Sequence, residues 1–307
     1  MKETAKDVLR WVSAKLPAGA HASLLEGATT DAWNLLRLAA KKCDVTSVGV
    51  TGEYGRIVGS VVDTAVLPIY ARTGHFAKRT NDLIASFFNG RDGQYLDVGA
   101  NIGLTTVPIA QQPQVQCLAI EADPTNFSHL SANVGMNCPH RNVTLRHCAV
   151  FNRRGTIDLQ LSPDNVGDHR VRVHGQAGVM GEDGWRTVSV PAEPLDSLVS
   201  SIAHPFVAKV DVQGAEPYVV EGGARVLSEA DLLIIEFAPY WLAQLGGDPS
   251  VVISFLTRTF DRLSIADGED APIGTPQSAG VVSERLFQYF TAERSNPHTY
   301  LDVIARR

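Results

Sequence analysis

The sequence lacks several features that would point to other kinds of protein. Its 307 residues include only four cysteines, with no C-x-x-C pair, so we expect a reducing compartment and no metal–thiolate site. No run approaches the roughly 18 consecutive apolar residues that span a bilayer. The opening segment MKETAKDVLRWVSAKL has charges scattered through it where a signal peptide has its apolar core. These absences predict a cytoplasmic protein with no membrane partner.

Positive charge is also scarce. The chain has 27 Lys and Arg against 33 Asp and Glu, a formal net charge of −6, which gives no electrostatic reason to expect nucleic acid as a partner. Hydrophobic residues make up 44 % and charged residues 20 %, which argues against intrinsic disorder. What remains is a folded protein that acts on a small molecule, either as a monomer or as a homo-oligomer.

The first 90 residues carry no chemistry that can be interpreted. Apolar periodicity predicts two helices before residue 45, around Trp11 and Trp33, with Asp31 as the N-cap of the second. A short hairpin is predicted around Thr51–Gly55, followed by a helix in TNDLIASFFNG. We expect residues 1–90 to form an extension that caps the substrate or contacts a second subunit, with the tryptophan faces packed on that subunit or on the core.

The pattern changes from Gln94 onward to short apolar runs separated by helical stretches. Strands that alternate with helices indicate a parallel α/β sheet with right-handed crossovers. The run ERLFQYF, after Ser283, is predicted to be the final strand. Residues 91–307 are thus one domain, with an insertion at about 151–205 that holds a β-hairpin. The expected strands are QYLDV, VQCLAIE, NVTLRHCAV, FVAKVDV, DLLIIEF and RLSIAD, with GTIDLQL, HRVRVH and TVSV in the insertion.

The sharpest local motif is YLDVGANIG, in which an apolar strand runs into a glycine turn and then into a helix that begins near Leu104. Small residues allow a ligand to approach the backbone, and the free amides at a helix start can receive polar groups. A dinucleotide-binding G-x-G-x-x-G counted from Gly99 would need glycine where this chain has Asn101 and Leu104. The turn therefore predicts a ligand site that is not the NAD type.

A carboxylate follows at the corresponding point of the next strand. Glu121 closes CLAIE, 24 residues after Asp97, and adjacent parallel strands bring such residues to the same edge of the sheet. An acid in this place can accept hydrogen bonds from both hydroxyls of a ribose. A glycine turn and a ribose acid without the pyrophosphate glycines match a nucleoside with an amino-acid tail, S-adenosylmethionine.

Six segments in order resemble the FkbM-type methyltransferases, a branch of the class I S-adenosylmethionine-dependent enzymes: DVGANIG, IEADPTNFSHLSANV, PLDSL, KVDVQGAE, VVEGG and IIEFAP. The resemblance covers about Asp92 to Pro239. It implies a Rossmann-like α/β sheet of seven strands with the last antiparallel, and methylation of hydroxyl groups on natural products and sugars. The implied cofactor residues are Asp97, Gly99, Asn101, Gly103, Glu121, Ala122, Cys148, Ala149 and Asp211.

The chain departs from the family pattern at two places. Gln213 stands where the family usually has a glutamate, and Gly74-His75-Phe76-Ala77 lacks the acid of the usual glycine-aromatic-glutamate segment. Both departures concern the substrate side more than the cofactor side.

Methylation of a hydroxyl needs a general base within hydrogen-bond reach. Asp211 and Glu236 each end an apolar strand at the ligand-binding edge, where a charge must be hydrogen-bonded or paired. Lys209 shares a strand face with Asp211 and can pair with it. In the insertion, His169 is an alternative base. The candidate catalytic residues are Asp211, His169 and Glu236, and the candidate substrate residues are Asp168, His169, Arg170, Glu216 and Tyr240.

Each of these residues also has a purely structural interpretation. Glu216 fits the first turn of a helix, where an acid is favourable against the dipole. The basic and apolar residues from 165 to 174, with Arg170 and Arg172, fit a charged hairpin edge. No carboxylates have metal-ligand spacing, so a divalent cation is not favoured and no metal ligands are assigned. The other functions left open are N-methylation of an amino group, NAD-dependent oxidoreduction, and cofactor binding without catalysis.

Overall fold

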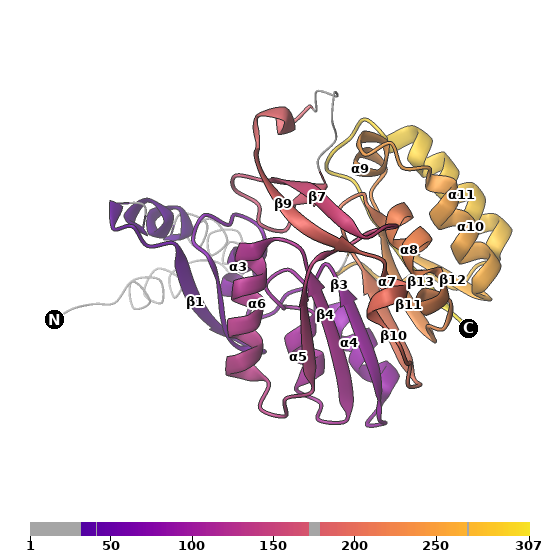
Figure 1. The fold of residues 1–307 in the computed structure, drawn as a ribbon, viewed down its shortest axis with the longest axis horizontal. Coiled ribbons are helices and arrows are strands. Elements are labelled where there is room, and N and C mark those ends of the chain that lie inside the picture. The colour runs from indigo at the N-terminus through magenta and orange to yellow at the C-terminus, as the bar shows by residue number, and fades with distance from the viewer. Residues whose placement is uncertain (1–31, 41, 172–178, 269) are drawn as a thin grey trace, which may run out of the picture.

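A seven-stranded sheet forms the centre of the computed structural model, which describes residues 32–40, 42–171, 179–268 and 270–307 (Figure 1). The strands lie in the order β12 (Arg262–Ala266), β13 (Leu301–Arg306), β11 (Leu232–Phe237), β10 (Phe206–Val210), β3 (Gly93–Val98), β4 (Val115–Glu121) and β5 (Val143–His147). All pairs are parallel except those of β13, which runs antiparallel to both neighbours. The α/β fold with an antiparallel last strand is confirmed.

Helices cover both faces of this sheet (Figure 1). The helices bury their apolar residues in two separate clusters. One cluster contains residues of α8, α10 and α11, and the other contains residues of α3, α4 and α5. Asp123 caps α6 by accepting hydrogen bonds from the amides of Thr125 and Asn126, as the Asp-Pro pair predicts. The helix bounds are α3 (Val66–Thr73), α4 (Lys78–Phe88), α5 (Thr106–Ala110), α6 (Pro124–Asn137), α7 (Leu195–Leu198), α8 (Glu216–Ser228), α9 (Pro239–Gln244), α10 (Pro249–Thr259) and α11 (Ala279–Glu293).

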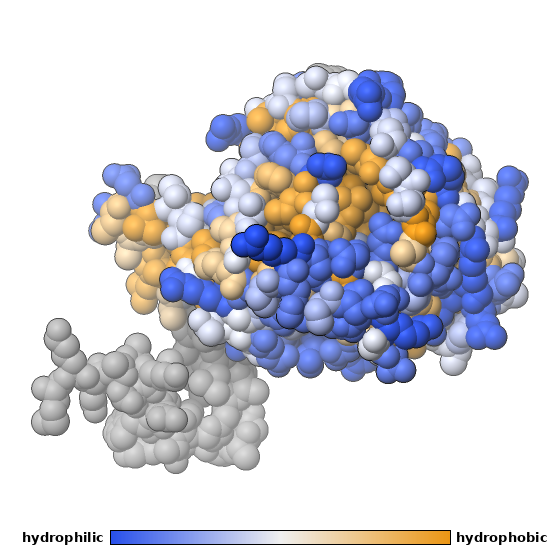
Figure 2. All heavy atoms as spheres, turned by 60° about the horizontal axis from the view of Figure 1, so that its bottom comes forward, coloured by the Kyte–Doolittle hydropathy of each residue, from blue (hydrophilic) through white to orange (hydrophobic). Residues whose placement is uncertain are grey.

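The N-terminal extension packs on the sheet. The predicted hairpin is present as β1 (Ser47–Gly52) and β2 (Gly55–Ser60), and residues 32–40 are helical. Trp33 lies against the core, where its Nε1 donates to the Asp63 carbonyl at 2.7 Å. Leu35 and Leu38 are more than half exposed, and apolar residues reach the surface in Figure 2 at the end of the molecule that the extension occupies. The first predicted helix, with Trp11, and the expected N-cap Asp31 fall outside the described residues.

The predicted final strand is wrong. ERLFQYF lies inside helix α11, and the closing strand is β13, LDVIAR. Val282 and Leu286 are the buried residues of α11 and are four positions apart, as on one face of a helix. β13 is buried along nearly its whole length, as an interior strand should be. The helical period, rather than the aromatic content of ERLFQYF, decides its structure.

The insertion is larger than a hairpin. It forms a four-stranded sheet in the order β6 (Ala149–Val150), β9 (Arg186–Glu193), β7 (Gly155–Leu161) and β8 (Arg170–Val171), which stands over one end of the central sheet (Figure 1). Antiparallel pairing, as expected of a hairpin region, is present between β7 and β8 and between β7 and β9. Arg172 and His174 of the expected strand HRVRVH lie outside the described residues. Across the helices that the structure describes, none is long and apolar enough to cross a membrane.

Candidate cofactor and acceptor site

A cavity of about 500 Å³ opens at the carboxyl ends of the parallel strands, which is where open α/β sheets bind ligands. Its walls come from the turn after β3, the ends of β4, β10 and β11, the insertion, the extension and the loop before β13. Of the candidate residues, the cavity is lined by Gly99, Asn101, Glu121, Ala122, Cys148, Ala149, Asp168, His169, Arg170, Asp211 and Glu236. Asp97, Gly103, Glu216 and Tyr240 are not among the lining residues.

The turn after β3 is held in an unusual backbone conformation. Gly99 has a φ of 84°, and a Cβ atom there would collide with the carbonyl oxygen of Asp211, so only glycine fits. Asn101 has a φ of 52°, and its Oδ1 accepts a hydrogen bond from the Ile102 amide at 2.6 Å. The turn thus presents main chain to the cavity, as the motif predicts.

Glu121 closes β4 at the cavity wall. Its two oxygens accept hydrogen bonds from the amides of Asn101 and Asp123, both at 2.8 Å. Burial raises the pKa of this carboxyl to about 7. Asn126, from α6, lines the same wall with a buried Oδ1 that has no partner. A carboxylate and an orphaned carbonyl oxygen on a cavity wall suit the hydroxyl groups of a nucleoside.

Asp97 lies beneath the turn. It is fully buried, and its Oδ2 accepts hydrogen bonds from the hydroxyls of Thr105 and Thr106 at 2.8 and 2.6 Å. Its visible role is to brace the turn against the start of α5. Gly103, with a φ of 93°, likewise shapes the turn from outside the cavity.

The opposite end of the cavity is acidic. Lys209 Nζ donates to Asp211 Oδ2 at 2.8 Å, so the expected pair is present. Gln213 Nε2 donates to Asp211 Oδ1 at 2.9 Å and to Glu236 Oε2 at 3.1 Å. All four side chains line the cavity. The amide of Gln213 can join two carboxylates, whereas an ionised glutamate in its place has no proton to donate.

Glu216 supports the loop after β10 and does not face the cavity. It is the first residue of α8, is fully buried, and accepts hydrogen bonds from the amides of Val212 and Gly214 at 3.0 and 3.3 Å. Burial raises the pKa of its carboxyl to about 7. This geometry matches the structural interpretation of Glu216.

Arg170 joins the insertion to the main sheet domain. Its Nη2 lies 2.5 Å from Asp168 Oδ2, and its guanidinium lies 3.2 Å from the ring centroid of Trp241. Tyr240, beside Trp241 on α9, donates its hydroxyl to Glu182 of the insertion at 2.9 Å. Asp168, Arg170 and Tyr240 therefore fix the insertion over the cavity, and Tyr240 does so without lining it. No spacing pattern in the sequence indicates that Trp241 contacts Arg170 or that Glu182 contacts Tyr240.

His169 lines the cavity with a constrained ring. Its Nδ1 accepts a hydrogen bond from the Ser162 amide at 3.0 Å, and burial lowers its pKa. A neutral imidazole that accepts at Nδ1 carries its proton on Nε2. In this form His169 can donate a hydrogen bond to a ligand, but it has no free nitrogen with which to take a proton.

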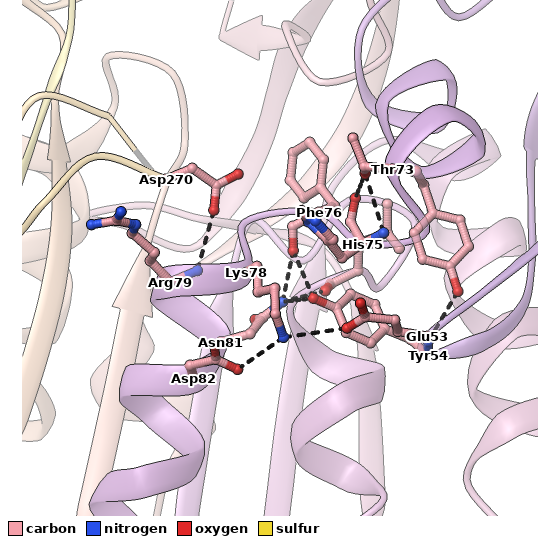
Figure 3. Close-up of polar contacts among 12 residues, drawn as sticks. Glu53, Tyr54, Thr73, His75, Phe76, Lys78, Arg79, Asn81, Asp82 and Asp270 are labelled. Atoms are coloured by element: carbon pink, nitrogen blue, oxygen red, sulfur yellow. Dashed lines mark hydrogen bonds and ion pairs between the residues drawn. The ribbon is translucent and has the colours of Figure 1, made fainter. Parts of the chain in front are cut away.

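The extension supplies wall residues that the sequence did not reveal. Val66, Ile69 and Phe76 line the cavity. The segment with Phe76 is fastened by a buried amide: Asn81 Nδ2 donates to the carbonyls of Phe76 and Leu104 at 2.9 and 3.0 Å, and Tyr54 also bonds the Phe76 carbonyl (Figure 3). The departure at Gly74–Ala77 was the only signal that singled out this segment.

A loop of the insertion crosses between the glycine turn and the extension. The Val166 carbonyl accepts hydrogen bonds from Asn101 Nδ2 at 3.2 Å and Asn126 Nδ2 at 2.8 Å. Two residues earlier, the Asp164 carbonyl accepts from the amide and the hydroxyl of Thr64, both at 2.7 Å.

In the part of the chain that the structure describes, no group of three or more His, Cys, Asp or Glu could hold a metal ion.

Residues 97–262 match the Methyltransferase FkbM domain, which is more than half of the chain. The chain belongs to the FkbM methyltransferase family. It is similar to the hexuronic acid methyltransferase AglP of Haloferax volcanii, with 29 % identity over 188 residues that cover 59 % of this chain and 70 % of that protein. It is also similar to the 2-O-methyltransferase NoeI of Sinorhizobium fredii, with 27 % identity over 169 residues, 50 % of this chain and 67 % of that one.

Solved structures resemble this FkbM protein only loosely. TYW2 of M. jannaschii in complex with AdoMet has 13 % identity and a TM-score of 0.38, and the match covers 85 % of this chain and 87 % of that one. Precorrin-6y C5,15-methyltransferase of Geobacter metallireducens has 12 % identity and a TM-score of 0.35, covering 74 % and 87 %. At these scores the likeness carries no conclusion about this chain. Family membership makes the protein a methyltransferase.

Proposed function

We propose that this methyltransferase uses S-adenosylmethionine to methylate a hydroxyl group of a small natural product or a sugar moiety. The observation that carries the proposal is that one cavity joins Glu121 and the glycine turn to the paired acids Asp211 and Glu236. The name of one relative, a hexuronic acid methyltransferase, agrees with a sugar as acceptor, and the name of the other, a 2-O-methyltransferase, agrees with transfer to oxygen.

The cofactor end of the cavity fits a nucleoside with an amino-acid tail. Glu121 would accept hydrogen bonds from the ribose hydroxyls, with Ala122 beside it, and Cys148 and Ala149 would border the adenine. The main chain of Gly99 and Asn101 would surround the methionine part, with Asp97 and Gly103 holding the turn in shape from behind. When bound, the cofactor supplies an electrophilic methyl group.

Asp211 is the proposed general base. Its carboxylate lines the cavity and is fixed on one side by Lys209 and on the other by Gln213. A base fixed from both sides is already oriented, which lowers the entropic cost of placing it against the acceptor. Asp211 would take the proton of the acceptor hydroxyl as the new carbon–oxygen bond forms and the methyl carbon–sulfur bond breaks, with S-adenosylhomocysteine as the leaving group. Glu236 would orient the acceptor. His169, which carries its proton on Nε2, would serve as a hydrogen-bond donor to the acceptor.

The extension and the insertion are proposed to select the acceptor. Phe76 and Trp241 give the cavity apolar walls, and Arg170 is already occupied by Asp168. This distribution suits a ring with one apolar face and several hydroxyls, because sugars stack on aromatic side chains and form hydrogen bonds at their edges.

The test is an acceptor screen with methyl-labelled S-adenosylmethionine and a panel of sugars, aminosugars and hydroxylated natural products, followed by location of the label. We expect the label on oxygen. Label on nitrogen would replace the proposal with N-methylation. Thermal shifts with S-adenosylmethionine, S-adenosylhomocysteine and NAD provide a check that needs no acceptor, and stabilisation by NAD alone would overturn the cofactor assignment.

A further inference from the structure

The acidic end of the cavity includes a largely buried group of charges that spans three strands. We call Lys209, Asp211, Glu236 and Asp302 the Lys209 cluster. Lys209 and Asp211 belong to β10 and the loop after it, and Glu236 of β11 lies directly opposite Asp302 of β13 in the antiparallel register. Lys209, Glu236 and Asp302 are only 4, 6 and 6 % exposed. These three charged groups are thus largely out of contact with water, whereas the Asp211 side chain is 22 % exposed.

The charges of the cluster do not balance. One ammonium faces three carboxyl groups, so full ionisation would leave a net charge of 1 − 3 = −2. Gln213 donates hydrogen bonds to Asp211 and Glu236 but brings no charge. Unpaired buried charge is costly, and a carboxyl group in such a place takes up a proton instead.

The neighbouring titratable groups do not supply the missing positive charge. Asp97 of β3 lies opposite Lys209 in the parallel register, and Glu216 lies at the start of α8; both are acids with hydrogen-bond partners of their own. Arg79 of α4 lines a small second cavity together with Asp302, but Arg79 is exposed. The backbone amide of Arg79 donates a hydrogen bond to Asp270 Oδ1 (Figure 3). None of these three residues therefore neutralises the excess negative charge of the cluster.

The excess of negative charge should raise the pKa of the buried carboxyl groups, and this is found for two members of the cluster. Burial, together with the nearby Asp211, raises the pKa of Glu236 well above its ordinary value. Burial also raises the pKa of Asp302 to about 7, although Lys209 opposes the shift. Residues opposite each other in antiparallel strands have neighbouring side chains on one face of the sheet, and neighbouring carboxyl groups titrate as a pair.

We propose that Glu236 and Asp302 share a proton, and that a positive charge entering the cavity beside Asp211 displaces it. This inference rests on the proposed function, because the entering charge would be the sulfonium of S-adenosylmethionine. In the exchange a carboxyl O–H bond breaks, the carboxylate keeps the electron pair and the proton goes to the buffer. The protein would then bind the cationic cofactor with proton release, and the neutral product S-adenosylhomocysteine without it.

Calorimetry tests this exchange without any acceptor. S-adenosylmethionine and S-adenosylhomocysteine are each titrated into the protein at pH 7 in two buffers of different ionisation enthalpy, which gives the number of protons released. We expect the cationic ligand to release more protons than the neutral one, by on the order of half a proton. Both ligands carry the same ribose, so the contribution of Glu121 cancels in the difference.

Two variants assign the proton to the pair. Asp302→Asn and Glu236→Gln should each reduce the difference between the ligands to near zero. The matched control is Asp267→Asn, at a carboxylate just after β12 that is 76 % exposed and outside the cluster; it should keep the wild-type difference. Equal proton release by the two ligands in the wild-type protein would overturn the inference, and so would an unchanged difference in both cluster variants.

Carboxyl-carbon NMR of the wild-type protein covers the case in which a variant fails to fold. We expect a carboxyl resonance that titrates near or above pH 7 with S-adenosylhomocysteine, and at lower pH with S-adenosylmethionine. Identical titrations with the two ligands would contradict the inference. Absence of binding by either ligand would contradict the proposed function instead, so the two failures are distinguishable.

Discussion

The two ends of the cavity are built in different ways. At the end proposed for the cofactor, Glu121 is held by main-chain amides from the adjacent turn and from the residue two positions later. At the acidic end, Asp211 is held by the side chains of Lys209 and Gln213, and Glu236 faces Asp302 from a strand 66 positions further along the chain, since 302 − 236 = 66. The contacts at the first end come from the main chain of nearby residues, whereas those at the second end come from side chains on several strands.

The difference implies that substitutions at the two ends should affect turnover and cofactor affinity separately. Asp211→Asn should lower turnover by roughly 10²- to 10⁴-fold, because it removes the proposed base, while binding of S-adenosylmethionine changes only a few-fold. Single-turnover rates and calorimetric affinities measure the two effects. Full turnover of this variant with the true acceptor would show that Asp211 is not the base.

The complementary change is Glu121→Ala. It removes the proposed acceptor for the ribose hydroxyls, and a hydroxyl donor left unpaired in a buried site costs about 1–3 kcal/mol. Cofactor affinity should therefore fall by roughly 5- to 150-fold, measured by calorimetry with S-adenosylhomocysteine. The variant Glu121→Gln, which keeps an acceptor oxygen, serves as control and should lose less. Unchanged affinity in the alanine variant would remove Glu121 from the cofactor site.

The pKa of Glu121 predicts a pH dependence of cofactor binding. The ribose hydroxyls would donate to the ionised carboxylate, and the pKa of this group is raised to about 7 in the folded protein. Affinity should thus weaken as the pH falls below 7, by up to about tenfold per unit. For stability the sign is opposite: the raised pKa favours the folded state at low pH, and this contribution is lost as the pH rises from the unfolded value toward 7. A binding profile that is flat from pH 6 to 8 would contradict this assignment.

The smallest expected effect lies in the wall that the extension supplies. Phe76→Ala should raise KM for the acceptor several-fold and leave cofactor affinity unchanged, because Phe76 is placed by Asn81 and not by the cofactor turn. Replacement of Phe87, a partly buried residue of α4 that is absent from the cavity wall, by alanine is the matched control. A loss of cofactor affinity in Phe76→Ala would mean that the extension belongs to the cofactor end.

The same contrast explains what the sequence could predict. The motif from Tyr95 to Gly103 and the position of Glu121 are local, so their spacing alone located the turn and the acid on one edge of the sheet. Asp302 could not be found in this way, because its strand becomes a neighbour of Glu236 only when the sheet closes. Assignment of ERLFQYF as the last strand hid β13 and Asp302 with it.

The contacts of the insertion could not be predicted from the sequence, for a related reason. The basic and apolar pattern around Arg170 fits either a solvated edge or a substrate contact. The structure instead buries Arg170 against Trp241 of α9, a partner 71 positions away, since 241 − 170 = 71. No local pattern records a contact over that separation.

The close approach of Gly99 to Asp211 gives the site its precision. The Asp211 amide donates to the Val98 carbonyl at 3.0 Å, and its own carbonyl occupies the space that a side chain at residue 99 would need. The glycine turn and the proposed base therefore meet at one main-chain junction. We therefore expect side-chain replacements elsewhere in the cavity to change which acceptor enters, while the spacing between the turn and Asp211 stays the same.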